Sequence, residues 1–148
     1  NGEEIRLKTP FSLFPLLTGL LSDERKNRLL SHLRDRSAFS SYFPVPSVSM
    51  DEPVFDAEQM WRGPSWVNVN YLLVEGLEKS GFVEEARKLR QVTLEKLMKF
   101  PDFYEYYNPL NGKPGKKAAP ILGWSAALFI DMALQETRSF SRKDAGTV

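Results

Sequence analysis

The sequence predicts an all-α domain. Apolar residues recur at helical spacing in five segments, and no segment shows the strict apolar–polar alternation of a β-strand. Nearly apolar segments also alternate with amphipathic ones, as expected when inner helices are buried and outer helices face water. We therefore expect helical hairpins arranged around a shared axis, in one domain or in a piece of a larger one.

The first two helices are predicted from apolar spacing and capping residues. Residues 12–20 carry leucines at helical spacing, and this helix should begin near Ser12, because Pro15 is tolerated only in a first turn. Ser22 can cap a second, amphipathic helix that runs to about Arg34. The only histidine, His32, lies in that helix, and we interpret it as a surface histidine rather than a metal ligand or base.

A long connection, residues 35–63, separates these helices from the next pair. It is rich in serine, proline and aromatic residues, so we expect it to pack down and line a site. A nearly apolar helix from Ser65 to about Lys79 follows, with Pro64 suited to its first turn. An amphipathic helix, residues 83–99, comes next and is stopped by Pro101.

A second long loop and a last helix complete the chain. Asn-Pro and Asn-Gly pairs at residues 108–109 and 111–112 predict tight turns. The last helix, Gly123 to about Gln135, is again nearly all apolar and is predicted to be buried. The polar tail, residues 138–148, is expected to fray.

The composition excludes several functional classes. A net charge of +1 gives no electrostatic basis for binding nucleic acid or an anionic membrane. The absence of cysteine excludes disulfides, thiolate metal sites and a cysteine nucleophile; it is compatible with a reducing compartment, such as the cytoplasm, but does not identify one. No apolar run is long enough to predict a membrane span. The chain opens at Asn1 without methionine or a signal-peptide pattern, so we expect that it was processed, tagged or cut from something longer.

The stretch from Gln59 to Tyr71 offers the densest set of candidate binding groups. Gly63 permits a backbone angle or a close approach that a side chain would forbid. Indole surfaces beside planar hydrogen-bonding groups suit a ligand with flat apolar faces and many hydroxyls. The same stretch can also be a packed helix start. The candidate residues are Gln59, Trp61, Arg62, Gly63, Trp66, Asn68 and Asn70.

Three motifs together resemble a known enzyme family. They are Met60–Asn70, Phe103–Pro109 followed by Gly112, and Gly123–Leu128. In order and spacing they resemble the C-terminal part of an (α/α)6-barrel glycoside hydrolase of family 63. This group includes processing α-glucosidase and the mannosylglycerate and glucosylglycerate hydrolases. The resemblance covers nearly all of this chain but only the last helices of the barrel, so residues 1–148 would be the C-terminal portion of one catalytic domain.

The resemblance implies an inverting hydrolysis in which Glu105 is the general base. Neighbouring tyrosine hydroxyls can hold the ionised carboxylate by hydrogen bonds, although an ordinary surface glutamate would also fit this loop. The family's acid, an aspartate, lies upstream of the matched part, outside this chain. We interpret Asp51 and Asp56 as loop-structuring or pocket residues.

The resemblance also implies a sugar-binding wall. Trp61 and Trp66 would stack on pyranose faces or close the pocket, and Arg62 would bind a carboxylate or paired hydroxyls. The remaining expected wall residues are Gln59, Gly63, Asn68, Asn70, Tyr106, Tyr107 and Trp124. Asn68 and Asn70 can instead cap or cross-link helices, and Trp124 can be a core residue. Met60 departs from the family's aromatic residue at this position.

The sequence therefore predicts part of a glycosidase for α-glucosides or related small glycosides, with no cofactor or metal. Alone, the chain should be inactive because it lacks the acid and half of the pocket. Its expected partners are a carbohydrate, the N-terminal part of the barrel and other copies, through exposed inner helices. A non-catalytic helical module that binds glycans or proteins, or a trehalase-like (α/α)6-barrel enzyme, remains an alternative.

Overall fold

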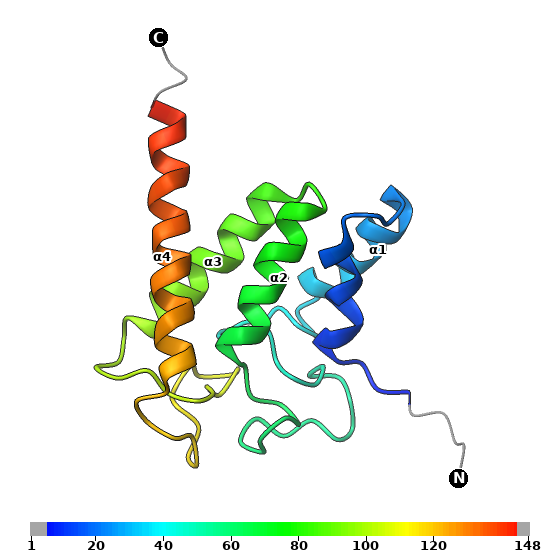
Figure 1. Ribbon diagram of the computed structural model, residues 1–148. Helices are drawn as coiled ribbons and strands as arrows, with labels where there is room; N and C mark the ends of the chain where they lie inside the picture. The colour runs from blue at the N-terminus through cyan, green and yellow to red at the C-terminus, as the bar shows by residue number, and fades with distance from the viewer. Residues whose placement is uncertain (1–5, 145–148) are drawn as a thin grey trace.

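The described part of the protein is a layer of helices with two long loops at one end (Figure 1). A computed structural model describes residues 6–144, with side chains to residue 138. The regular secondary structure of these residues consists of helices and isolated β-bridges, which confirms the all-α prediction. The elements are the 3-10 helix η1 (Pro10–Thr18) and the α-helices α1 (Asp23–Arg34), α2 (Val67–Lys79), α3 (Val83–Leu97) and α4 (Gly123–Asp144).

The first helices form near the predicted positions. η1 begins at Pro10, two residues before the predicted start, and is a 3-10 helix with Pro15 inside it. Because proline has no N–H and clashes with the preceding turn, a regular α-helix is disfavoured there. The predicted cap of α1 is confirmed, since the Ser22 hydroxyl accepts the Arg25 N–H at 3.5 Å.

The start of α2 and the end of α4 differ from prediction. α2 begins at Val67, so Pro64 does not lie in its first turn. The backbone of Ser65 is instead paired with Tyr107, and this pairing requires an extended conformation. α4 continues to Asp144 rather than ending near Gln135, because no glycine or proline interrupts it. Fraying of the tail remains a prediction, and residues 145–148 lie outside the described residues.

The core is built around α2, which packs against η1, α3 and α4. Leu73, Val74 and Leu77 are almost completely buried there. Each such side chain contributes about 1.5–3 kcal/mol through removal of apolar surface from water. Gly76 permits the close approach of η1, since a Cβ at this position would lie 3.2 Å from the Cβ of Leu16.

The prediction that α4 is buried on most sides is wrong for the described residues. Trp124, Ile130 and Leu134 expose 46%, 58% and 48% of their surface. α4 lies at one edge of the layer, so its neighbours α2 and α3 cover only one of its sides (Figure 1). No helix in the described residues is both long and apolar enough to span a membrane.

A polar network holds α4 against its neighbours. Arg90 of α3 is almost fully buried and bonds to Glu78 of α2 and Glu136 of α4. Burial opposes its charge, but these carboxylates outweigh that effect and leave the pKa of Arg90 raised. Tyr71 of α2 donates to Asp131 of α4 at 2.7 Å, and this hydrogen bond, with burial, raises the pKa of Tyr71 to about 12.

Candidate active site

The three sequence motifs meet at the end of the layer where α2 and α4 begin (Figure 1). Backbone hydrogen bonds join the first two motifs, and the Ser125 hydroxyl of the third donates to the Tyr104 carbonyl at 3.0 Å. The Ser47 N–H donates to the Pro64 carbonyl at 3.0 Å, and Ser65 and Tyr107 exchange two bonds of 2.8 and 2.9 Å. The Gly115 N–H donates to the Tyr106 carbonyl at 3.0 Å. Segments far apart in sequence are therefore fixed side by side.

Residues 56–63, here called the corner loop, close on themselves. The Asp56 N–H donates to the Arg62 carbonyl at 2.9 Å, and the Arg62 N–H donates to the Gln59 carbonyl at 2.9 Å. A Cβ at Gly63 would lie only 2.1 Å from the Asp56 carbonyl oxygen. The interpretation of Gly63 as a site of close approach is therefore confirmed, and the glycine shapes the loop from within.

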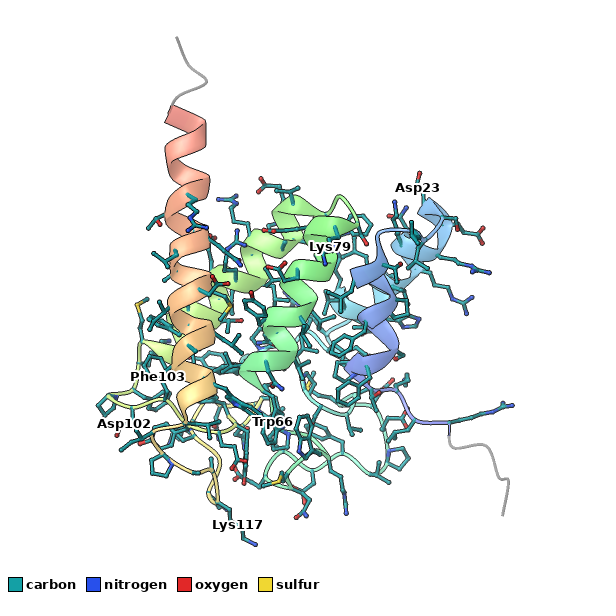
Figure 2. All side chains as sticks on the ribbon, in the orientation of Figure 1. Asp23, Trp66, Lys79, Asp102, Phe103 and Lys117 are labelled. Atoms are coloured by element: carbon teal, nitrogen blue, oxygen red, sulfur yellow. The ribbon has the colours of Figure 1, made fainter. Side chains whose placement is uncertain are left out.

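The corner loop presents Trp61 on a support made by Trp66. The two indoles stack at 3.9 Å with 9° between their planes, and Trp61 has a left-handed φ of 59°. Trp66 is only 1% exposed and lies at the base of α2 (Figure 2). Trp61 is 39% exposed, and Trp124 contacts Trp66 edge-on with 46% of its surface open. Trp61 and Trp124 are thus accessible stacking surfaces, whereas Trp66 supports both of them. Because Trp66 is buried, its ring face cannot contact a sugar directly.

Three polar side chains near the stack retain unused hydrogen-bonding capacity. Gln59 and Arg62 are exposed, and the Arg62 guanidinium forms no hydrogen bond or ion pair within residues 6–138. The Asn68 Oδ1, at the start of α2, is buried without a partner there, as is the Trp66 Nε1. A buried polar atom without a partner is costly, so a bonding partner from a ligand or from further protein is expected here.

Asn70 is a scaffold residue, and the assignment of its side chain to the substrate wall is wrong. It is completely buried, and its oxygen accepts the Val45 N–H at 3.0 Å. Its amide nitrogen donates to the Pro44 carbonyl and, at 3.1 Å, to the Thr93 hydroxyl. This is the cross-linking alternative considered for the Asn-x-Asn pair. Both amide N–H donors are used, and the complete burial of the side chain keeps a ligand away from its oxygen.

Tyr107 is also removed from the substrate wall. Its ring stacks on Phe43 at 4.7 Å and is completely buried. Its hydroxyl accepts the Tyr104 N–H at 3.0 Å, and burial raises the pKa of Tyr107 to about 12. The residue therefore holds the second loop in place.

Glu105 lies half-buried in the segment here called the Glu105 loop, residues 101–122. Its N–H donates to the Ala119 carbonyl at 3.0 Å, and its Oε2 accepts the Ala119 N–H in a long 3.5 Å contact. The expected hydrogen bond from a tyrosine hydroxyl does not form within the described residues. Most of the carboxylate's lone pairs therefore remain available.

Tyr106, beside Glu105, is only 1% exposed and contacts the ring of Trp66 at 5.2 Å. Burial, together with the charges of Glu105 and Glu58, raises the pKa of Tyr106. The ring of Tyr106 therefore packs between the two loops, and its hydroxyl experiences the charges of the Glu105 and Glu58 carboxylates.

The sequence interpretation missed Glu58, which joins the two loops. Its carboxylate accepts the Asn108 amide at 2.7 Å and the Lys116 N–H at 3.0 Å. Both partners are at least fifty residues away, so no local signal points to them. Asp51 and Asp56 have the expected loop-structuring contacts: Asp51 bonds to Lys8 and Ser49, and Asp56 accepts the Glu58 N–H.

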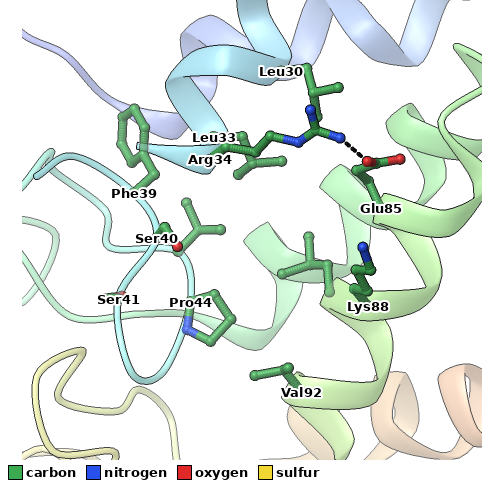
Figure 3. Close-up of a pocket in the computed structure, with 12 residues that line it drawn as sticks. Leu30, Leu33, Arg34, Phe39, Ser40, Ser41, Pro44, Glu85, Lys88 and Val92 are labelled. Carbon is green, nitrogen blue, oxygen red and sulfur yellow. Dashed lines mark hydrogen bonds and ion pairs between the residues drawn. The ribbon is translucent and has the colours of Figure 1, made fainter. Parts of the chain in front are cut away.

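A cavity of about 310 Å³ lies elsewhere, between α1, α3 and the connection that follows α1 (Figure 3). Its floor is apolar and an ion pair between Arg34 and Glu85 lies at its rim. It contains none of the predicted site residues. No group of histidine, aspartate and glutamate side chains within residues 6–138 is arranged to hold a metal ion, and His32 is exposed on α1.

Known proteins resemble this chain in sequence and structure. Residues 1–129 match the family described as the mannosylglycerate hydrolase MGH1-like glycoside hydrolase domain. The mannosylglycerate hydrolase of Thermus thermophilus is 36% identical over 127 residues, which cover 86% of this chain and 30% of that protein. The crystal structure of a GH63 mannosylglycerate hydrolase from Thermus thermophilus with glucose has a TM-score of 0.77, 33% identity, and coverage of 88% of this chain and 31% of that one. The structure of that enzyme with Tris and D-glycerate gives a TM-score of 0.72, 33% identity and the same coverage. The chain thus spans about a third of the length of these relatives.

Proposed function

The chain belongs to the mannosylglycerate hydrolase MGH1-like family of glycoside hydrolases, and on this basis we propose that it supplies the general base and one wall of an inverting glycosidase. Its hairpins are part of an (α/α)6 barrel. In an inverting reaction one carboxylic acid protonates the leaving oxygen while a second carboxylate activates water on the opposite face of the sugar. Glu105 is the second carboxylate, and the acid lies outside this chain.

One observation carries this proposal: the backbone pairing of Ser65 with Tyr107 ties the Glu105 loop to the corner loop. A base must be fixed relative to the sugar that it serves, because a small displacement of the reacting groups costs a large part of the rate. Glu105 is half-buried and accepts only one long hydrogen bond from the described residues, so it retains lone pairs for a water molecule.

We propose that the substrate is a small α-linked glycoside with a carboxylate-bearing aglycone. Trp61 and Trp124 offer open aromatic faces for a pyranose ring, and Gln59 and Asn68 offer polar groups for its hydroxyls. The Arg62 guanidinium, which has no partner in the described part of the chain, suits a carboxylate. The relatives solved with glucose and with D-glycerate support a glycosyl glycerate, either mannosyl or glucosyl.

We propose further that the exposed apolar faces of this chain pack against other helices of the barrel. Ile130 and Leu134 are exposed on α4, which lies at one edge of the layer, where a further hairpin would continue the ring. Association of two copies through the same faces is the competing outcome, and the oligomeric state in solution distinguishes the two.

The test uses the protein as its gene encodes it, assayed on mannosyl- and glucosylglycerate and on matched glycosides without a carboxylate. Glu105→Gln should lower kcat by about a hundredfold or more at an unchanged melting temperature, since the amide cannot accept a proton. Glu95→Gln, a surface glutamate on α3, is the matched control. Arg62→Ala should raise KM for the glycerates but not for the uncharged glycosides. Wild-type turnover by Glu105→Gln would remove its assigned role.

A further inference from the structure

Glu58 is the only side chain of the corner loop with hydrogen bonds to the Glu105 loop among the described residues. Its Oε1 accepts the Asn108 Nδ2 at 2.7 Å, and its Oε2 accepts the Lys116 N–H at 3.0 Å. Its own N–H donates to the Asp56 Oδ1 at 2.9 Å, which fixes the orientation of its backbone. Both carboxylate oxygens are thus committed to one neighbouring loop.

The partner side chain, Asn108, is itself held rigidly. It is 6% exposed, and its Oδ1 accepts the N–H groups of Leu110 and Asn111 at 2.8 and 3.3 Å. Its backbone carbonyl accepts the Gly112 N–H at 2.8 Å. Asn108 therefore closes the predicted tight turn and leaves only its amide N–H to project toward Glu58.

Each loop that Glu58 joins carries part of the proposed site. Trp61 and Arg62 follow Glu58 by three and four residues in a loop that is closed on itself. Glu105 precedes Asn108 by three residues in the other loop. The backbone pairing of Ser65 with Tyr107 fixes the base of the two loops, whereas Glu58 joins them nearer the exposed side chains.

We propose that Glu58 is a positioning residue, whose carboxylate fixes the Glu105 loop relative to the wall formed by Trp61 and Arg62. The inference rests on the proposed glycosidase function and adds to it a residue that does not touch the substrate. Loss of these bonds lets the two loops move apart, and a displacement of about 1 Å between the base and the bound sugar can cost about a hundredfold in rate.

The electrostatic surroundings keep this connection charged. Burial favours the neutral form, but the hydrogen bonds from Lys116 and Asn108 and the charge of Lys116 outweigh burial and the nearby Asp56, so the pKa of Glu58 is lowered. The carboxylate is therefore ionised at neutral pH, and its two hydrogen bonds are charge-assisted, which makes them stronger than neutral ones.

An exchange of the two side-chain functions tests the proposal. Glu58→Gln has one acceptor oxygen for two donors, so its NH2 group must face either the Asn108 amide or the Lys116 N–H, and one of the two bonds is lost. Asn108→Asp turns a carboxylate toward Glu58, so each single variant weakens the connection. The double variant Glu58→Gln/Asn108→Asp restores it in reverse, with Gln donating to Asp while its oxygen accepts the Lys116 N–H. Glu52→Gln is the matched control in the same connection, since among the described residues its carboxylate accepts only the Lys8 N–H.

The variants are made in the protein as its gene encodes it and are assayed well below each melting temperature. Each single variant should lower kcat/KM by about ten- to a hundredfold. The double variant should recover to within about threefold of wild type, and Glu52→Gln should stay within about twofold. Hydrogen exchange of residues 56–62 and 105–116 should rise in the single variants and return in the double variant.

The outcomes separate this inference from the proposed function. Wild-type kcat/KM in both single variants, with Glu105→Gln inactive, would overturn the positioning role and leave the glycosidase proposal intact. Lower melting temperatures with unchanged kcat would reduce Glu58 to a stabilising residue and would also overturn it. If the wild-type protein hydrolyses no glycoside, the proposed function fails, and the exchange data alone decide whether Glu58 holds the two loops together.

Discussion

Substitution of Asn70 should destabilise the protein far more than substitution of Asn68, two residues earlier on the same helix. Asn70→Ala leaves the Val45 N–H and the Pro44 carbonyl without partners in a completely buried segment. Each unsatisfied group costs about 1–3 kcal/mol, so the free energy of unfolding should fall by about 4 kcal/mol. For a domain of this size that corresponds to a melting temperature lower by about 8–16 °C.

Asn68→Ala is the matched control for this prediction. The Asn68 side chain forms no hydrogen bond within residues 6–138, and its Oδ1 is already unpartnered. Its removal should therefore change the free energy of unfolding by no more than about 0.5 kcal/mol. Circular dichroism during urea and thermal unfolding measures both variants. Equal destabilisation by the two variants, or a loss below about 1 kcal/mol for Asn70→Ala, would refute the assignment of Asn70 to the scaffold.

Three further predictions rest on the same geometry. Gly63→Ala should lower the free energy of unfolding by about 2 kcal/mol, because the new Cβ meets the Asp56 carbonyl oxygen at 2.1 Å; a melting temperature within about 2 °C of wild type would contradict so close an approach. Tyr71 and Tyr107 have folded-state pKa values of about 12, above the ordinary 10.0, so the stability that their neutral forms contribute is intact below pH 10 and is lost as pH rises through 12. Tyrosinate absorbance recorded during alkaline unfolding checks this, and ionisation of both residues near pH 10 in the folded protein would oppose it. Residues 1–148 alone should hydrolyse no glycoside if, as proposed, the acid partner of Glu105 belongs to another part of the barrel; turnover by this chain, measured by sugar release, would mean that its own residues supply the acid.

Local patterns were sufficient to predict that these helices form, but not where all of them begin and end. The apolar spacing and Ser22 predicted α1, and the apolar run after Trp66 predicted α2, because helix formation depends on neighbours three and four residues apart. The start of α2 was misjudged because Ser65 is held by Tyr107, a contact across forty-two residues of sequence that no local pattern contains.

The site residues were predicted less completely than the helices. Sequence similarity identified Glu105, Trp61 and Arg62 as candidates, but it could not distinguish exposed from buried members of the motif. Trp61 and Trp66 are both indoles in one short stretch, yet one is open and the other is its support. Exposure depends on the elements that pack around each side chain, so it is a property of the assembled loops.

By itself, the sequence determined the helical class, the family and the loops that carry the candidate chemistry, because periodicity, glycine and proline act locally and motifs retain their order. Only the tertiary structure decided the role of each polar group. Asn68 and Asn70 are two residues apart on α2, so they point to different sides of the helix. Asn70 meets a buried backbone, to which both its oxygen and its amide nitrogen are bonded, and Asn68 lies at the site with an oxygen that has no partner among the described residues. Glu58 meets Asn108 only because two loops fifty residues apart lie together, and hydrogen bonds over such a separation depend on the whole fold.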